Sequence, residues 1–535
     1  MIRPNEEQMI VADAVASERT RVIAINALAG TGKTTTLAML AKGPLARTKI
    51  RYVTFNARAA AEARRRFGPN TVATTAHSHA WHSLYPNSAK TMAEVFGDRL
   101  VRQSLFGEMA QAATADVRLR RSFATAARAL HLERSGWRGG ISPLLQVIDE
   151  FAKSGDAHIT AANVPASVVA LAKKMNATDN IAALAAEARK LWSRQIDPEG
   201  TLPIPHGLYL KLASLHPEPI DAEVLFFDEA QDASAPMLRI IEAHVARGGR
   251  LVMVGDKHQH IYAWAGAMNA IDALADKFPD TSLTLPLCQS YRFGARIAEA
   301  GNIFLDAMGA DYRLVGLGPE GSTSEDGQTE TILFRSNVKM ILEILASQRQ
   351  DSTRKIHVVG GTKEMVVVLS DLANLYASRP LKGSELAGFA DWAELKSFAE
   401  TPLGSSYSPL VTLVERLRGS VGGIIAGLRR SEVRPAGANF IFSTAHKAKG
   451  AQWGSVKLSE EFQNAWEAAT AMNTQTHQEY CILPDDEELA LQYVAATRAE
   501  RLLAHRGLLP KAREHLRMMR CKQPVQRPAA HPRAR

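Results

Sequence analysis

The sequence predicts an α/β protein with two parallel-sheet cores in tandem, each interrupted by a mainly helical insertion. Apolar runs such as RVIAINA, VLFF and LVMV have the length of buried strands, and a polar loop follows each of them. Stretches of helical period alternate with these runs, and that alternation is typical of a parallel sheet. The chain has 535 residues, which is too many for one hydrophobic core and indicates several domains.

Residues 1–86 and 201–279 are expected to form the first core. Within it, RVIAINALAGTGKTTTLAMLAK has the pattern of a strand, a glycine-containing loop and a helix, and RYVTFNARAAAEARRRF repeats the strand and the helix. Further strands are expected in AEVLFFDEA and GRLVMVGD. Residues 87–200 are rich in Ala, Leu, Arg and Glu with helical spacing, and we expect them to form the first insertion.

Residues 280–365 and 437–505 are expected to form the second core, beginning with the strand SLTLPL. After a segment at 317–328 whose composition indicates a loop, TETILFRSN and KIHVVGG have strand patterns. NFIFSTAHKAKG and LQYVAATRAE then return to strand and helix patterns. Residues 366–436 are expected to form a second, smaller helical insertion, and residues 506–535 a disordered basic tail.

Composition places the chain among soluble globular proteins, with 46% hydrophobic and 22% charged residues. The start, MIRPNEEQMIVADAV, has no apolar signal core, and no apolar run has the length of a membrane span. We therefore expect a cytoplasmic protein. The three cysteines at 288, 481 and 521 have neither disulfide-framework nor zinc spacing.

The net charge of +9 comes mainly from one end of the chain. From Arg506 onward there are nine Lys or Arg residues and one acid, Glu514. Such a segment can add nonspecific attraction to nucleic acid, and it is equally compatible with a solvated terminus.

The segment ALAGTGKT (27–34) fits a phosphate-binding loop between a strand and a helix. Glycines in this loop allow backbone N–H groups to turn inward around phosphates, and the helix presents its positive end to the anion. Lys33 would reach the β- and γ-phosphates, and the Thr34 hydroxyl would ligate Mg²⁺. We therefore expect ATP and Mg²⁺ as ligands, with nucleotide contacts from Ala29, Gly30, Thr31, Gly32, Lys33, Thr34 and Thr35.

Paired acids end the predicted strand in VLFFDEAQD (224–232). Asp228 can hold Mg²⁺ through water, and Glu229 can orient and deprotonate the attacking water. Two acids after a strand are weak evidence by themselves. Together with the phosphate-binding loop they indicate phosphoryl transfer, with Thr34 and Asp228 as the expected metal residues.

Phosphoryl transfer also needs cations on the charge that develops at the γ-phosphate. Arg292 in QSYRFGARIAEAGN and Arg498 in YVAATRAERLL are the candidates, and both lie far along the chain from Lys33. An arginine finger is typically worth about 10³–10⁵ in rate. If both arginines come from the second core, hydrolysis requires the two cores to close on ATP.

These motifs, in this order, resemble those of the UvrD/Rep family of superfamily 1 DNA helicases, from about residue 5 to 505 outside the two insertions. NEEQ is similar to the adenine-reading motif, TFNARAAAE and TTAHSHAW to two DNA-contacting motifs, and FFDEAQD to the acidic motif. VGDKHQHIYAWAGA resembles GD-x-x-Q-x-IY-x-[FW]-RGA. LPLCQSYR, ILFRSN, FSTAHKAKGAQW and EELALQYVAATRAE resemble the later motifs. Within the family, the compact F-box DNA helicase branch or an equally compact phage-type branch is the most similar, although no F-box segment is visible.

The resemblance implies two RecA-like cores with ATP between them, single-stranded DNA across both, and 3′-to-5′ translocation. It implies that Gln8 reads adenine, Tyr291 stacks on it and Gln452 meets the ribose. Gln259 would sense the γ-phosphate, with Arg292 and Arg498 as the fingers. The residues implied on or near the DNA path are Phe55, Asn56, His77, Tyr262, Trp264 and His446. The histidines of HSHAWH (77–82) lack metal-site spacing.

Four positions depart from the family pattern. Ala265 and Ala490 stand where the family has Arg, and Ser290 stands where it has Asn. Gln452 replaces the Glu that would meet the ribose, so it keeps an acceptor but loses the charge. We therefore expect an intact ATPase with altered nucleotide affinity and one DNA or bridging contact fewer.

Two functions remain open from the sequence. One is an ATP-dependent DNA helicase and translocase that acts on single-stranded and tailed duplex DNA, in repair, recombination or replication. The other is a DNA-stimulated ATPase that remodels or strips protein–DNA complexes with little unwinding, which the small 366–436 insertion motivates. A phosphate-loop kinase would not need Gln259, Trp264 and a second core. RNA stays open as a track because base stacking does not choose between sugars. We expect a monomer or weak self-association, and nucleoid association if the protein is bacterial.

Overall fold

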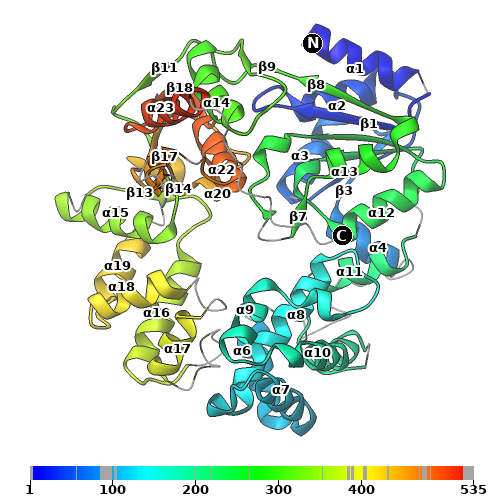
Figure 1. Cartoon of the computed structure of the whole chain (residues 1–535). Helices are drawn as coiled ribbons and strands as arrows, with labels where there is room; N and C mark the ends of the chain where they lie inside the picture. The colour runs from blue at the N-terminus through cyan, green and yellow to red at the C-terminus, as the bar shows by residue number, and fades with distance from the viewer. Residues whose placement is uncertain are drawn as a thin grey trace.

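A computed structural model gives the fold of the chain (Figure 1). The structure describes residues 4–17, 19–55, 57–84, 99, 101, 105–197, 199–205, 207–218, 220–263, 266–351, 353–381, 386, 389, 391–401, 407–430, 433–468, 470–472, 479–481 and 483–521. Asn56, Trp264 and Ala265 lie outside the described residues.

The first sheet has six parallel strands in the order β3-β2-β4-β6-β1-β8. Its central strands are mostly apolar because both faces are covered, and all six residues of β1 are buried. Since the strands are parallel, the loops at their carboxyl ends gather at one edge of the sheet. The strands are β1 (Val22–Ala27), β2 (Ile50–Thr54), β3 (Thr71–Thr75), β4 (Val224–Asp228), β6 (Arg250–Gly255) and β8 (Ser282–Leu287).

Helices cover both faces of the first sheet. One face packs against α1 (Glu6–Ala16), α2 (Lys33–Lys42) and α3 (Ala57–Arg66). The other packs against α4 (Ala76–Leu84), α11 (Leu208–Leu215), α12 (Ala235–Ala246) and α13 (Ala270–Lys277).

The second sheet also has six parallel strands, in the order β11-β18-β15-β12-β14-β13. One face carries α14 (Ala295–Ala307), α20 (Ala445–Ala448), α21 (Glu461–Ala468), α22 (Asp486–Ala496) and α23 (Leu508–Cys521). The other carries α15 (Asn337–Gln350) and helices of the second insertion. The strands are β11 (Ser322–Ser324), β12 (Thr331–Phe334), β13 (Ile356–Val358), β14 (Phe440–Thr444), β15 (Trp453–Leu458) and β18 (Ala499–Ala504). Three two-stranded pairings complete the strands: β5 (Ala233–Ser234) with β7 (Ala267–Met268), β9 (Gln289–Ser290) with β10 (Val315–Gly316), and β16 (Thr470–Met472) with β17 (Glu479–Cys481).

Two parallel sheets with helices on both faces confirm the predicted fold class of tandem RecA-like cores with helical insertions. The first helical segment has its own core and consists of α6 (Leu105–Ala115), α7 (Val117–Ala129), α8 (Ile141–Lys153), α9 (Ala166–Lys174) and α10 (Ile181–Ile196). The second consists of α16 (Lys363–Tyr376), α17 (Trp392–Ala399), α18 (Ser408–Arg416) and α19 (Gly422–Arg430).

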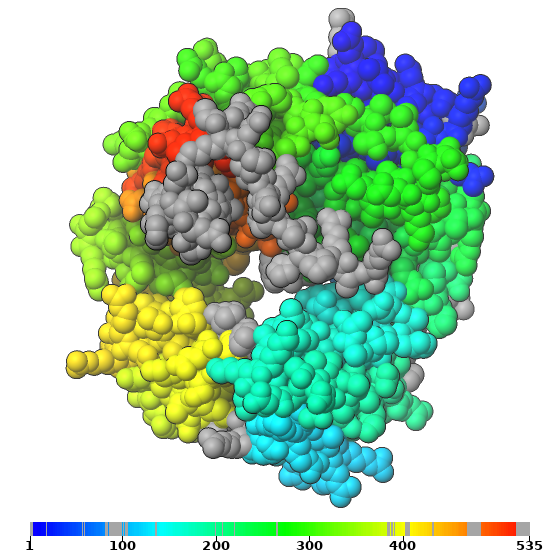
Figure 2. All heavy atoms as spheres, viewed as in Figure 1, coloured from blue at the N-terminus to red at the C-terminus, as the bar shows by residue number. Residues whose placement is uncertain are grey.

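The four parts surround a hollow. Figure 1 shows the cores side by side at the top and the helical segments below them, and Figure 2 shows the surface hollowed where the parts meet. The helical segments also touch each other, because the rings of Phe106 and Phe389 stack with their centroids 5.6 Å apart. Among the described residues no helix has the length and apolarity needed to cross a membrane.

Three sequence expectations need correction. SLTLPL was expected to begin the second core, but β8 pairs with β1, so the edge of the first sheet is built from residues beyond 279. The expected loop at 317–328 contains β11, a short edge strand on β18. The expected disordered tail begins with a helix, α23, because Leu508, Leu509 and Ala512 recur on one face and are buried.

Leu509→Ala should lower the free energy of unfolding of the second core by about 2–5 kcal/mol, because it empties a buried site. Urea denaturation measures this change as a lower midpoint with an unchanged slope. Glu514→Ala, at an exposed position of the same helix, is the matched control and should leave the midpoint in place. Equal midpoints for both variants would mean that α23 does not pack on the core.

Candidate active site

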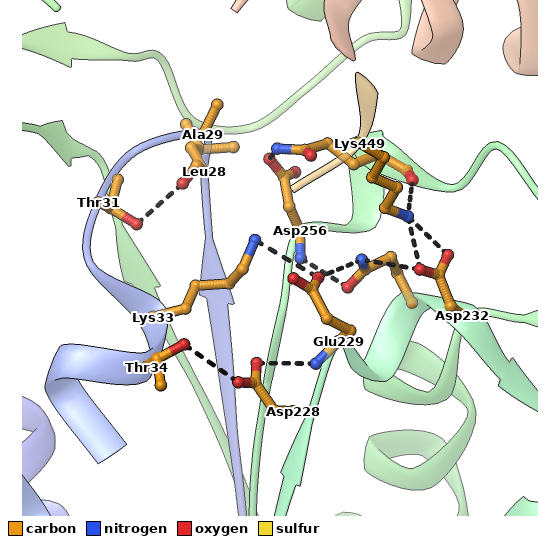
Figure 3. A network of polar contacts seen from close by, with 12 residues as sticks. Leu28, Ala29, Thr31, Lys33, Thr34, Asp228, Glu229, Asp232, Asp256 and Lys449 are labelled. Atoms are coloured by element: carbon orange, nitrogen blue, oxygen red, sulfur yellow. Dashed lines mark hydrogen bonds and ion pairs between the residues drawn. The ribbon is translucent and has the colours of Figure 1, made fainter. Parts of the chain in front are cut away.

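The phosphate-binding loop lies between β1 and α2 (Figure 3). Gly30 and Gly32 have φ of 77° and 84°, the left-handed region that side chains rarely adopt. A Cβ at Gly30 would also collide with Ser290 and Arg292, which approach the loop from the segment after β8. The loop therefore needs glycine both for its backbone and for the close approach of the following segment.

Asp228 ends β4 beside the start of α2. The Thr34 hydroxyl lies 3.2 Å and the Tyr52 hydroxyl 2.6 Å from Asp228 Oδ2, and each donates to that oxygen. Asp228 Oδ1 accepts from the backbone N–H of Glu229. A buried carboxylate beside a hydroxyl is a donor set of the hard oxygen type that Mg²⁺ prefers.

Glu229 follows in a left-handed backbone conformation, with φ of 56°. This conformation is uncommon for a residue with a side chain, and such strain gathers at functional sites. It turns the carboxylate toward the loop, where Glu229 Oε2 lies 3.6 Å from Lys33 Nζ. Gln231 Nε2 donates to the same oxygen at 2.7 Å and fixes its orientation.

The pKa values of Asp228 and Glu229 are shifted in opposite directions. Burial raises the pKa of Asp228, and the charge of Glu229 raises it further. Burial alone would raise the pKa of Glu229 as well, but the charges of Lys33 and Lys449 lower it below its usual range. Glu229 is therefore held as a carboxylate that can accept a proton.

The next strand of the sheet, β6, carries Asp256 and Gln259 just beyond its end. Gln259 Nε2 donates to Asp256 Oδ2 at 2.8 Å, and Gln231 Oε1 accepts from the Asp256 backbone N–H. Arg498, which follows α22 of the second core, donates to Gln259 Oε1 at 3.4 Å. Gln259 therefore lies between the acids of one core and an arginine of the other.

Both predicted arginine fingers face this edge. Arg498 is 1% exposed and is held by the carbonyls of Val494 and Ala451. Arg292 donates to Gln452 Oε1 and to the carbonyl of Thr497, each at 2.9 Å. Burial and the charge of Arg292 lower the pKa of Arg498 to about 9, so it remains a cation at neutral pH.

Tyr493 of α22 joins the cores at the phosphate-binding loop. Its hydroxyl donates to Asp256 Oδ2 at 3.1 Å and accepts from the backbone N–H of Ala29 at 3.0 Å. A second contact comes from Lys449, whose ammonium binds Asp232 and the carbonyl of Gln259 (Figure 3). Neither Tyr493 nor Lys449 was singled out from the sequence, although both lie inside motifs quoted above.

The expected adenine contacts lie beside this region. Gln8 donates to Thr36 Oγ1 at 3.0 Å, and its Oε1 accepts from the backbone N–H of Asn5 in the capping box of α1. Tyr291 is 48% exposed, and its hydroxyl accepts from Asn5 Nδ2 at 2.9 Å. Its ring is thus presented at the surface, as a base-stacking platform requires.

A cavity of ≈ 360 Å³ opens between the cores. The loop glycines, the cations Lys33, Arg292 and Arg498, and the oxygens of Thr34 and Asp228 fit a magnesium–triphosphate group in charge and donor chemistry. Arg66 of α3 also reaches it, which no sequence motif indicated. The lining residues are Gly30, Thr31, Gly32, Lys33, Thr34, Thr35, Arg66, Glu229, Gln259, Tyr291, Arg292, Gly450, Gln452 and Arg498.

The residues expected on a DNA path are only partly brought together. The Tyr262 hydroxyl donates to the carbonyl of His446 at 3.1 Å, so this pair meets across the cores. Phe55 and His77 follow β2 and β3, and their rings contact Phe227 and Tyr209 of the first core. Asn56 and Trp264 lie outside the described residues.

The structure also supplies residues that sequence reasoning missed. Tyr52 binds Asp228 from the neighbouring strand, and Gln231 links Glu229 to the backbone of Asp256. The letters DEAQD contain Gln231, whereas Tyr52 sits inside an apolar run and carries no local signal. Such partners become visible only once the strand order is known.

Comparison with known proteins agrees with this geometry. A family model described as an AAA domain matches residues 10–265. F-box DNA helicase 1 of Gallus gallus is 27% identical over 549 residues, covering 96% of this chain and 49% of the relative. F-box DNA helicase protein 1 of Schizosaccharomyces pombe is 27% identical over 518 residues, covering 90% of this chain and 55% of the relative. The chain thus spans about half the length of these two curated relatives.

A shorter match links the chain to a bacterial helicase. ATP-dependent DNA helicase Rep of Escherichia coli is 34% identical over 82 residues, which is 15% of this chain and 12% of the relative. The tandem sheets, the ordered motifs and these likenesses agree with one another. The chain is therefore similar to UvrD/Rep-like superfamily 1 DNA helicases, over most of its length to the F-box DNA helicases and over a short segment to Rep.

Proposed function

We propose that this chain hydrolyses ATP to move 3′-to-5′ on single-stranded DNA and to separate strands ahead of it. The observation that carries the proposal is the composition of the cavity wall. Lys33 and Glu229 come from the first core, whereas Arg292 and Arg498 come from the second. Because catalysis needs both sets, hydrolysis is tied to the approach of the two cores.

Each residue has a distinct part in this reaction. Lys33 and the loop N–H groups bind the β- and γ-phosphates. Glu229 orients the attacking water and takes its proton. Thr34 and Asp228 would hold Mg²⁺, which supplies charge neutralisation on the phosphates when it is bound. Arg292 and Arg498 stabilise the charge that develops in the transition state. Gln259 contacts the γ-phosphate, so the position of the loop that follows it depends on whether this phosphate is present.

The DNA track is proposed across the carboxyl ends of both sheets. Phe55 and His77 stand at the ends of neighbouring strands, and Tyr262 with His446 stands where the cores meet. Aromatic rings of this kind bind bases by stacking. The choice of DNA rather than RNA rests on the likeness to the F-box DNA helicases and to DNA helicase Rep.

Lys33→Ala should abolish ATP hydrolysis, because the cation that grips the phosphates is lost. Steady-state phosphate release with saturating single-stranded DNA measures the effect. Lys42→Ala, at the exposed end of the same helix, is the matched control and should keep wild-type turnover. Undiminished turnover in Lys33→Ala would place the phosphate site elsewhere.

Glu229→Gln should bind ATP yet hydrolyse it about 10²–10⁴-fold more slowly, because an amide cannot take the proton from water. Equilibrium binding of a fluorescent ATP analogue, set beside single-turnover hydrolysis, separates the two effects. A hydrolysis rate near that of the wild type would require another group to act as the base.

A duplex with a 3′ single-stranded tail should be separated in the presence of ATP, and a duplex with a 5′ tail should not. Strand displacement on both substrates, with Lys33→Ala protein as the negative control, tests activity and polarity together. DNA-stimulated hydrolysis without displacement of either substrate would favour the remodelling ATPase. Tails of RNA in a parallel series test the nature of the track.

A further inference from the structure

Lys449 crosses from the second core to the first just after α20. Its ammonium lies 2.7 Å and 2.6 Å from the two carboxylate oxygens of Asp232, and 2.7 Å from the carbonyl oxygen of Gln259. The side chains of Lys449 and Asp232 are 9% and 14% exposed. An ammonium has three N–H donors, and these contacts can satisfy all of them.

A pair this deeply buried behaves differently from a surface ion pair. Desolvation of both charges is expensive, and the attraction offsets it only when geometry and hydrogen bonds are good. Removing one partner leaves an uncompensated buried charge. Because Lys449 and Asp232 belong to opposite cores, the pair is complete only while the cores stay together.

The same lysine touches a ring proposed for the DNA path. Its ammonium lies over Tyr262, 5.1 Å from the ring centroid, which is within cation–π range. The hydroxyl of Tyr262 in turn donates to the carbonyl of His446 in α20. Two stretches of chain, 259–262 and 446–449, are therefore joined at three points.

Both stretches continue into the nucleotide site. Gly450, which follows Lys449, lines the cavity, and so do Gln452 and Gln259. Asp232 follows Gln231, whose side chain binds Glu229 and the backbone of Asp256. The Lys449 contacts thus lie between the residues around the γ-phosphate position and the ring of Tyr262.

We propose that Lys449 is a positioning residue whose bonds to Asp232 and Gln259 transmit closure of the cores on nucleotide to the Tyr262 ring. This proposal rests on the function proposed above. Lys449 is not among the residues that line the cavity. Its effect on turnover comes through the placement of Gln259 and of the acidic loop, in addition to the charge by which it lowers the pKa of Glu229.

Lys449→Met keeps the length of the side chain and removes its charge. It should lower the kcat of DNA-stimulated hydrolysis by about 5–150-fold, the usual range of a coupling between two sites, while the KM for ATP changes less than about twofold. Asp232→Asn should behave alike, and the double variant should lose no more than either single variant. Lys449→Arg, which can still bind a carboxylate, should recover part of the rate.

Lys447→Met, two residues earlier and within α20, is the matched control. Lys447 is partly exposed, and its ammonium lies 3.9 Å from Glu364, a residue of the second helical segment and not of the first core. Its turnover and its DNA stimulation should equal those of the wild type. A loss as large as that of Lys449→Met would assign the effect to the net charge of residues 445–449.

Hydrogen exchange gives a readout that needs no hydrolysis. Peptides that cover 259–262 and 446–449 should exchange together, faster in Lys449→Met and Asp232→Asn than in wild type, with a non-hydrolysable ATP analogue bound. Unchanged exchange, or strictly additive losses of kcat in the double variant, would overturn the role of Lys449. Wild-type protein without any ATPase would instead overturn the proposed function, and the exchange data would still decide whether the contact couples the two stretches.

Discussion

The placement of the two cores depends on buried charged side chains whose hydrogen-bond partners come partly from the opposite core. Asp256 and Arg498 are 0% and 1% exposed, and an unpaired buried ion costs several kcal/mol. In each case partners come partly from the opposite core: Tyr493 donates to Asp256, and Arg498 donates to Gln259. A small apolar contact accompanies them, because Leu28, Ala29 and Ile261 of the first core pack into the core of the second. The relative placement of the sheets is thus set by matched polar groups around a limited hydrophobic contact.

This arrangement leaves the cavity with an excess of positive charge. Lys33, Arg292 and Arg498 face Glu229, and the mutual repulsion of the two arginines contributes, after burial, to the lowered pKa of Arg498. A polyphosphate would relieve that repulsion while it contacts both cores. Under the proposed function, nucleotide and closure would stabilise each other, and this would be the physical basis for coupling hydrolysis to movement.

Whether the sequence could predict a part of the site depends on how far apart in the chain the contacting residues lie. The glycines of the loop, Lys33 and the acids after β4 are predictable because each depends on a strand followed at once by a polar turn. The pairing of β8 with β1 was not predictable, because the pattern of SLTLPL indicates a strand but does not indicate which strand it pairs with.

Lys449 and Tyr493 were missed for a related reason. Their roles come from residues 190 and 237 positions away, Gln259 and Asp256, and only the assembled fold reveals them. The start of α23 was not predicted, because the basic composition of the segment indicated disorder, although the spacing of its apolar residues is that of a helix.

The departures from the family pattern are where the sequence alone is most ambiguous and the structure most informative. Gln452 accepts from Arg292 Nε at 2.9 Å and donates to Glu500 Oε1 at 2.6 Å. A glutamate at this position could accept from the arginine but could not donate, and its carboxylate would face that of Glu500 at hydrogen-bond distance. The amide therefore does more than omit a charge, since it links Glu500 to Arg292, which lines the cavity. Ser290 is buried against Gly30, where the loop leaves no room for a Cβ, and its Oγ has no hydrogen-bond partner among the described residues. Ala490 is 3% exposed within the apolar core of the second sheet, a place where an arginine would have to find buried partners or displace its neighbours. The altered positions thus leave Lys33, Glu229, Arg292 and Arg498 around one cavity.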